Sequence, residues 1–210
     1  TLGINIKNLN SVGKNSSEYK SSPQVELMGE INLTTKYPLI KQTKDDINYL
    51  TPKILLKFNP SDMKNYATSS RTVIVDDIFN SNRLALSDTF ETGKSLTLGI
   101  DYKKEKIDNN NKFVEFKLAT VLRDKEENFI PNKTTLNKKN SNIFGSINNN
   151  FSDFFNLNYK FSLDNNLDAI EYSDLSAEFK LNNFNTKFNF IEESGEMGSS
   201  NFLENETNFQ

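Results

Sequence analysis

Apolar and polar residues alternate along most of this chain with a period of two. The clearest segment is Phe154–Asp164, where every second residue from Phe155 to Leu163 is apolar and those between are polar. Successive side chains of a β-strand point to opposite faces of the sheet, so this alternation predicts a strand with one apolar and one polar face. The pattern predicts six further strands: Leu2–Ile6, Val25–Leu33, Ser95–Tyr102, Val114–Leu122, Leu175–Leu181 and Phe184–Phe190. No segment has a sustained helical stripe.

One of these segments has a break in its alternation. Ile170 and Tyr172 lie on the opposite parity to the apolar residues of Leu175–Leu181. A β-bulge inserts one extra residue into a strand and so exchanges the two faces. We therefore predict a bulge near Ser173–Asp174.

The connections between the predicted strands are of two kinds. Three are tight polar turns, at Asp108–Asn111, Phe151–Asp153 and Asn182-Asn183. Three are long and polar, at Asn59–Lys94, Arg123–Ser141 and Glu192–Phe202. Short turns at one end and long loops at the other are typical of outer-membrane barrels, in which the turns are periplasmic and the loops extracellular.

The pattern predicts an all-β fold, an antiparallel up-and-down segment of a transmembrane β-barrel. No apolar run approaches the ~20 residues of a membrane helix, whereas a barrel strand needs only ~10 alternating residues. A soluble all-β sandwich and a β-solenoid also have alternating strands and remain alternatives. The absence of a fixed repeat period weighs against the solenoid.

Composition narrows the range of functions. The 25 basic and 28 acidic residues nearly balance, so no nucleic-acid partner is implied. The chain has no cysteine and no histidine, which excludes thiolate and Ser-His-Asp chemistry and Cys/His zinc sites. Hydrophobic residues make up only 35% of the chain, yet aromatic residues reach 11%. This composition fits a sheet with one apolar and one water-facing side better than it fits a disordered chain. We expect no cofactor, and only a carboxylate-based enzyme remains open.

Two candidate chemical motifs have simpler interpretations. Gly93-Lys94-Ser95 resembles the end of a phosphate-binding loop, but Asp88 stands where the motif needs glycine and no helix is predicted to follow. We interpret it as the start of a strand. The acid pairs Asp45-Asp46, Asp76-Asp77 and Glu126-Glu127 lie in predicted connections, where solvated carboxylates are common. We therefore assign them no catalytic or calcium site.

The stretch Val75–Gly93 stands out because it is far longer than a turn requires. A long connection inside a compact domain is usually functional or disordered. This one contains several acids, a single arginine and apolar anchors. We predict a loop that is ordered by pairing of Arg83 with carboxylates and by burial of Phe79 and Leu84, and that folds into a barrel mouth. A floppy surface loop is the alternative.

This stretch resembles a motif in the barrel domain of the lipopolysaccharide-assembly family LptD, also called the organic solvent tolerance family. Phe79, Arg83, Asp88, Glu91 and Gly93 match the family pattern, and Gly99-Ile100-Asp101-Tyr102 matches the strand that follows. Two positions depart from the pattern, because Leu86 replaces a glycine and Thr89 replaces a second arginine. The resemblance implies a structural or gating loop that includes Asp76, Asp77, Phe79, Arg83, Asp88, Glu91 and Gly93.

Further short motifs follow in the family's order. Leu50-Thr51-Pro52-Lys53 is similar to the opening of a family strand. Asn142-Ile143-Phe144-Gly145 and then Asn156–Asp164 are similar to two later strands. The resemblance therefore spans roughly Leu50–Phe190, with the first fifty residues less similar.

The resemblance implies a non-catalytic role in the cell outer membrane of a Gram-negative bacterium. Members of the family form a large barrel that is plugged by the lipoprotein LptE. Periplasmic bridge proteins deliver lipopolysaccharide, which the barrel assembles into the outer leaflet. Polar residues predicted to face the lumen are Glu115, Lys117, Asn156, Asn158 and Lys160.

Residues 1–210 are expected to be part of one barrel domain, an open arc of roughly ten strands truncated at both ends. We expect the periplasmic jelly-roll domain of the family not to be among these residues. The alternatives are another outer-membrane barrel, such as a porin or nutrient receptor, and a secreted β-rich adhesin.

Overall fold

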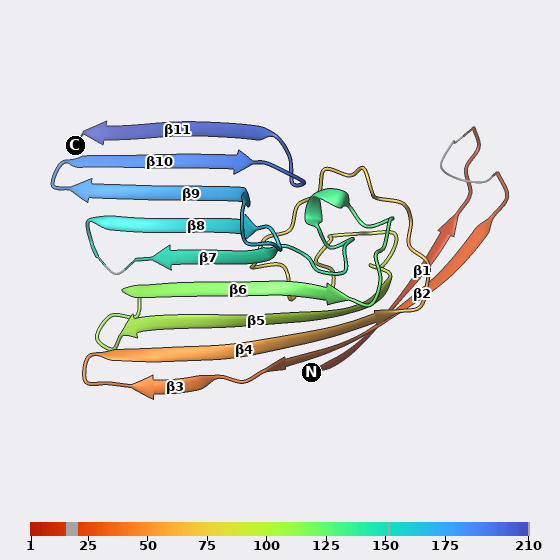
Figure 1. Cartoon of the computed structure of the whole chain (residues 1–210), viewed down its shortest axis with the longest axis horizontal. Helices are drawn as coiled ribbons and strands as arrows, with labels where there is room; N and C mark the ends of the chain where they lie inside the picture. The colour runs from red at the N-terminus through yellow and green to blue at the C-terminus, as the bar shows by residue number, and fades with distance from the viewer. Residues whose placement is uncertain (16–20, 151, 210) are drawn as a thin grey trace.

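A computed structural model describes residues 1–15, 21–150 and 152–209 of the chain. Among them, eleven strands form one sheet, with a single short 3-10 helix (Figure 1). The strands are β1 (Leu2–Ser11), β2 (Gln24–Lys36), β3 (Leu39–Gln42), β4 (Asp46–Asn59), β5 (Gly93–Lys106), β6 (Phe113–Arg123), β7 (Ile143–Asn149), β8 (Phe155–Leu163), β9 (Ile170–Leu181), β10 (Phe184–Glu193) and β11 (Ser200–Phe209), and η1 is Asn132–Thr134. No helix in the described parts of the chain is long and apolar enough to cross a membrane.

The sheet is antiparallel and follows the order of the chain from β1 to β11. β2 and β3 act as one strand, since Lys36 pairs with Lys53 and Leu39 pairs with Leu50 in the same register on β4. The ladder is interrupted at Pro38, which has no N–H to donate. The sheet is open, with β1 and β11 at its two edges. The predicted antiparallel up-and-down arc is therefore confirmed.

Six of the seven segments with predicted alternation lie within strands, Phe154–Asp164 extends one residue beyond β8 at each end, and β5 begins at Gly93 as expected. The alternation produces an apolar face, which includes Leu56 and Leu98, and a polar face, which includes Lys57 and Thr97. One interpretation was wrong: Leu50-Thr51-Pro52-Lys53 does not open a strand, because β4 begins four residues earlier, at Asp46.

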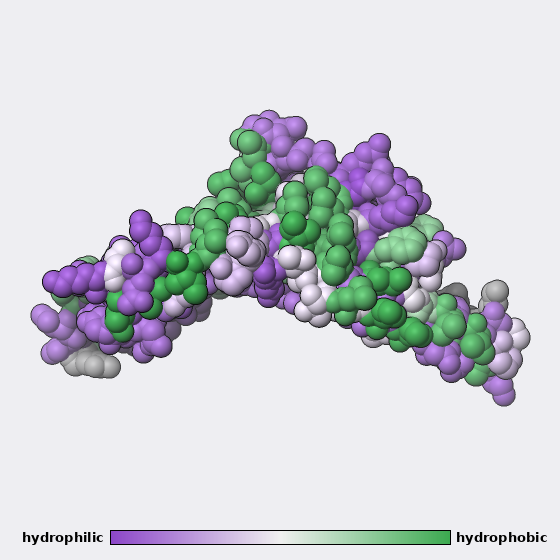
Figure 2. All heavy atoms as spheres, turned by 90° about the horizontal axis from the view of Figure 1, so that it is seen from below, coloured by the Kyte–Doolittle hydropathy of each residue, from purple (hydrophilic) through white to green (hydrophobic). Residues whose placement is uncertain are grey.

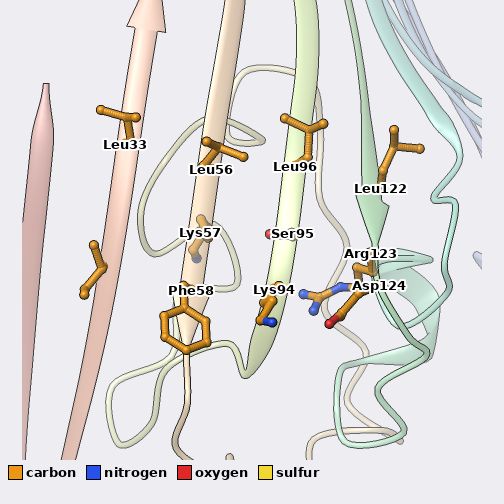
Figure 3. A pocket seen from close by; sticks show the side chains of 11 residues that line it. Leu33, Leu56, Lys57, Phe58, Lys94, Ser95, Leu96, Leu122, Arg123 and Asp124 are labelled. Carbon is orange, nitrogen blue, oxygen red and sulfur yellow. The ribbon is translucent and has the colours of Figure 1, made fainter.

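The apolar face carries a row of four leucines across four strands. Leu33 pairs with Leu56, Leu56 with Leu96, and Leu96 with Leu122. They line a groove of about 640 Å³, in which they follow one another from strand to strand (Figure 3). Leu33 and Leu56 remain 42% and 46% exposed, so no protein core covers this face among the described residues. Seen from the β3–β4 side, hydrophobic residues gather over the middle of the molecule (Figure 2).

Tight turns gather at one end of the sheet and long connections at the other (Figure 1). The turns at 107–112 and 182–183 are short, as predicted, and so is the β7–β8 turn, in which Phe151 lies outside the described residues. The loops 60–92 and 124–142 are long, as predicted. The long Glu192–Phe202 loop was wrong, since Glu193 pairs with Ser200 and only 194–199 separates β10 from β11. The strands β10 and β11 extend through these polar residues because the hydrogen bonds between strands are made by backbone groups, whatever the side chains are.

The predicted bulge exists, but it lies earlier than expected. Ser162 pairs with Tyr172 and Leu163 pairs with Ile170, so the extra residue is Glu171 and not one of Ser173–Asp174. Glu171 is buried, and its Oε2 accepts a hydrogen bond of 2.6 Å from Asn142 Nδ2. The bulge directs this carboxylate onto its partner on the polar face, a contact that the alternation alone does not reveal.

Candidate functional site

The loop 60–92 lies against the polar face of the sheet, where it forms a packed structure. Eleven buried residues make one apolar cluster there. The loop contributes Met63, Val73, Val75, Ile78, Leu84 and Leu86, the strands Ala119, Val121 and Phe144, and the loop 124–142 contributes Ile130 and Leu136. The prediction of an ordered loop with Leu84 buried is therefore confirmed, and the floppy surface loop is excluded.

The two long loops are joined to each other as well as to the sheet. The backbone N–H of Tyr66 donates to the carbonyl of Phe129 at 2.9 Å, and that of Asn132 donates to the carbonyl of Ala67 at 3.0 Å. Helix η1, which begins at Asn132, lies beside this junction. We call the loops 60–92 and 124–142 together the loop layer.

Phe79 packs into a notch on the polar face that a glycine provides. A Cβ atom on Gly99 would lie 2.7 Å from the Phe79 ring and 2.8 Å from the carbonyl oxygen of Leu118. The Phe79 ring also carries Lys53 Nζ at 4.6 Å from its centroid, a cation–π contact. Phe79 packs against the apolar cluster and is partly buried, which agrees with its predicted burial.

Glu91 is the centre of a buried ion cluster. Arg83 binds its carboxylate with two hydrogen bonds, of 2.8 Å from Nε and 2.5 Å from Nη2. Lys57 Nζ lies 3.2 Å from the same carboxylate, and Arg123 pairs with it through Nη2. The side chain of Arg83 is 0% exposed and that of Glu91 is 4% exposed. The predicted pairing of Arg83 with a carboxylate is confirmed, and Glu91 is that carboxylate.

Charges this deeply buried are stable only when they are paired. Burial raises the pKa of Glu91, but the positive charges of Arg83, Lys57 and Arg123 outweigh it and hold the pKa well below its ordinary value. Lys57 is shared with a second buried carboxylate, Glu30, at 3.0 Å. The cluster therefore joins β2, β4 and β6 to the loop.

Arg83 also binds β5. Its Nη1 donates to Thr97 Oγ1 at 2.8 Å and its Nη2 to Ser95 Oγ at 3.0 Å, while Nη1 also lies 3.4 Å from the carbonyl oxygen of Ile78. With the two bonds to Glu91, these contacts occupy the five N–H groups of the guanidinium. A lysine could not reproduce this set.

The first strand reaches the loop through Lys7. Its Nζ donates hydrogen bonds to the carbonyl oxygens of Leu86 and Thr89 at 2.8 and 2.7 Å and lies over the Phe90 ring. Thr89 stands where the family pattern has a second arginine. Here its backbone carbonyl, rather than a charged side chain, ties the loop to β1.

Asp76 brings together two groups of predicted residues. Its carboxylate lies 2.9 Å from Lys117 Nζ on β6 and 3.8 Å from Lys160 Nζ on β8. Glu115 joins this group through Lys117 at 3.1 Å. Unlike the ion cluster of Glu91, the Asp76–Lys117 ion pair is accessible to solvent, since the Asp76 side chain is 40% exposed.

Of the other predicted residues, Gly93 borders the cluster, since a Cβ atom on it would lie 3.5 Å from Arg123 Nη1, and the rest lie apart from it. Asp77 is exposed and bonds Asn80, and Asp88 binds Tyr66 and Lys64. Gly93 has a positive φ of 83°, and a side chain there would meet Glu127. On the polar face beyond the loop layer, Asn156 bonds Glu178 at 3.2 Å and Asn158 is exposed.

The sequence interpretation missed Lys57, Arg123 and Glu30 as parts of the site. Each occupies the polar parity of its strand, as Lys57 does between Leu56 and Phe58. That is a weak signal, because a charged residue on the polar parity is equally expected to face water. Their convergence on Glu91 depends on the cross-strand register.

Comparison with known proteins supports the resemblance found in the motifs. Curated proteins give no significant match to the chain. The family model of LptD, described as LPS transport system D, matches residues 5–205. This match includes nearly all of the sheet, both long loops and every residue of the ion cluster. The chain therefore belongs to the LptD family.

Proposed function

We propose that this chain forms part of the wall of an outer-membrane translocon that assembles lipopolysaccharide into the outer leaflet without catalysing a reaction. Membership of the LptD family supports lipopolysaccharide transport as the general function. The observation that carries the proposal is the apolar face, whose dimensions suit a membrane. The loop layer supports the proposal further, because it packs on the opposite, polar face, which leaves the apolar face free to contact lipid.

The dimensions follow from β5. On its apolar face, residues Leu96 to Tyr102 are bounded by Lys94 at the loop end and Lys104 at the turn end. The ten steps from Lys94 to Lys104, at ~3.4 Å each, give about 34 Å along the strand, or about 26 Å across a membrane at a tilt of ~40°. The apolar band of outer-membrane barrels is about 25 Å tall. Lysine at both boundaries suits the two headgroup regions.

In this arrangement the leucine-lined groove faces acyl chains, and the polar face lines the lumen of the barrel. Glu115, Lys117, Asn156, Asn158 and Lys160 all lie on that face. The sheet is then one arc of a single larger barrel domain, whose other strands pair with the edges β1 and β11. The loops would be extracellular and the tight turns periplasmic. LptE as plug and the periplasmic bridge proteins as donors of lipopolysaccharide belong to this proposal.

Depletion of the full-length protein tests the function. When the only gene copy is repressed, newly made lipopolysaccharide should stop reaching the cell surface and accumulate behind the outer membrane. The readout is surface labelling of lipopolysaccharide, combined with separation of the membranes.

The same cells distinguish the alternatives. A porin or nutrient receptor would leave lipopolysaccharide delivery intact and reduce solute uptake, and an adhesin would affect only attachment. Normal surface lipopolysaccharide after depletion would refute the translocon.

A further inference from the structure

We propose that the leucine-lined groove on the apolar face binds one phospholipid whose headgroup has a phosphate and a primary ammonium group, that is, phosphatidylethanolamine. The phosphate pairs with Lys94 and the ammonium group with Asp124. This inference rests on the proposed function in one respect, namely that the apolar face contacts lipid. The site distinguishes one headgroup from another, which a general lipid-facing surface does not do.

The floor of the groove is a level row of side chains that suits acyl chains. Its four leucines stand side by side on β2, β4, β5 and β6, a width of about 14 Å at ~4.8 Å per strand (Figure 3). That width accommodates the two chains of one phospholipid. Toward the turn end, the cross-strand pair of Ile54 and Leu98 is 42% and 38% exposed, so the chains can continue along the wall.

Two residues of opposite charge lie at the loop end of the groove. Lys94 belongs to β5, and Asp124 follows directly after β6. Both line the groove, and Figure 3 shows them at the same end of it, beyond the leucines. Lys94 Nζ lies 5.8 Å from the centroid of the Phe58 ring. A headgroup whose acyl chains lie on the leucines therefore meets one positive and one negative charge.

Lys94 and Asp124 keep their charges available for a ligand. Both are exposed, and within the described parts of the chain neither side chain forms an ion pair or a hydrogen bond. The lysine at the turn end of the same face differs, because Lys104 pairs with Asp46 at 3.2 Å. The loop end of the apolar face is thus the end that can bind a charged headgroup.

The balance of charge determines which headgroup fits. Lys57 and Arg123 also line the groove, but their charges are taken up by Glu91 on the polar face. Lys94 and Asp124 then leave the groove with no net charge. A phosphate with an ammonium group satisfies both residues, whereas Asp124 repels a headgroup that has phosphate alone, as in phosphatidylglycerol or lipopolysaccharide. The ammonium group also has N–H donors for the carboxylate.

Native mass spectrometry of the full-length protein tests the site. The purified protein is incubated in detergent with equal amounts of phosphatidylethanolamine and phosphatidylglycerol that have the same acyl chains, and the retained lipids are counted. We expect the wild type to prefer phosphatidylethanolamine. Lys94→Gln should lower its retention about fivefold, the effect of one lysine at a membrane surface. Lys104→Gln is the matched control and should retain it normally.

Two further substitutions separate the headgroup contacts from the acyl-chain contacts. Asp124→Asn should shift the preference toward phosphatidylglycerol, because it removes the negative charge and leaves Lys94. A merely structural role of Asp124 would not change the preference between headgroups. Leu96→Ala should lower the retention of both lipids. Leu98→Ala, on the same face of β5 but outside the groove, is its control.

The outcomes separate the two proposals. Equal or stronger retention of phosphatidylglycerol by the wild type, lipopolysaccharide in place of the phospholipid, or an unchanged preference in both Lys94→Gln and Asp124→Asn would overturn the site. If depletion stops delivery of lipopolysaccharide but the wild type shows no lipid preference, only the site fails. If the preference is found but depletion leaves delivery intact, only the translocon function fails.

Discussion

Arg83 and Glu91, eight residues apart in one loop, form a bidentate ion pair on the polar face of the sheet, with hydrogen bonds of 2.8 and 2.5 Å. Neither side chain reaches solvent appreciably. Glu91 also forms ion pairs with Lys57 of β4 and Arg123 of β6. The Arg83–Glu91 pair therefore holds the loop to the sheet. The following predictions test that arrangement.

Replacing Glu91 by glutamine should loosen the loop layer. The substitution preserves shape but leaves Arg83, Arg123 and Lys57 without their shared charge, which costs about 3–5 kcal/mol for a buried pair. We expect a lower midpoint of heat-modifiable gel migration and faster protease cleavage within 60–92. Asp77→Asn, in the same loop but exposed, is the matched control. Equal behaviour of the two variants would contradict the role of Glu91.

Arg83→Lys should behave almost as poorly as Arg83→Ala. A lysine has three N–H groups at one point and cannot bind the carboxylate, Ser95 and Thr97 together. Protease cleavage of the loop is again the measurement. Arg71→Lys is the control, because Arg71 donates to the neighbouring carbonyl oxygens of Leu84 and Ala85 through one nitrogen and lies over the Tyr66 ring, contacts that a lysine can also make. If the loop of the Arg83→Lys variant resisted the protease as well as the wild-type loop, the hydrogen bonds of the planar guanidinium would not be needed.

Acid should release the loop layer from the sheet, and the titration of Glu91 should determine the pH range in which this happens. Its folded pKa lies well below the ordinary 4.5. Stabilisation is therefore complete above about pH 4.5 and is lost as the pH falls through the lowered folded value. Cleavage by an acid-active protease should rise only in that range. Glu91→Gln, which does not titrate there, should show a weaker pH dependence, and an unchanged one would exclude Glu91 as the cause.

Gly99→Ala should disturb the loop through Phe79. The new methyl group would lie 2.7 Å from the ring and 2.8 Å from backbone, and overpacking of this kind typically costs about 1–3 kcal/mol. Gly29→Ala is a matched control, because a Cβ atom there meets nothing within 4 Å. Combining Gly99→Ala with Phe79→Leu should recover part of the loss. Equal thermal midpoints for the two alanine variants would disprove the notch.

Leu98→Arg should impair insertion of the full-length protein into the membrane. Leu98 lies near the middle of the apolar band, where an arginine costs about 2–4 kcal/mol. Lys104→Arg, at the boundary of the band, should insert normally. The fraction of folded protein in purified outer membranes is the measurement. Normal insertion of Leu98→Arg would place the membrane elsewhere.

Most of the strands could be predicted from local pattern. The alternation in Phe154–Asp164 places β8 within one residue at each end, because side chains of a strand point to alternate faces whatever its neighbours are. The pairing of Arg83 with a carboxylate could also be predicted, since a single arginine lies among acids in one loop. The choice of Glu91 over Asp88 could not, because both lie within reach along the chain.

The sequence by itself determined the two faces of the sheet, the ends at which turns and loops gather, and the family. Only the tertiary structure decided what meets across strands. Lys57, Arg123 and Glu30 join the Glu91 cluster because the register of β2, β4, β5 and β6 aligns them. The bulge is at Glu171, where the carboxylate accepts a hydrogen bond from Asn142, a residue distant in the chain. A period of two is a local property of a strand, whereas register depends on contacts between residues distant in the chain.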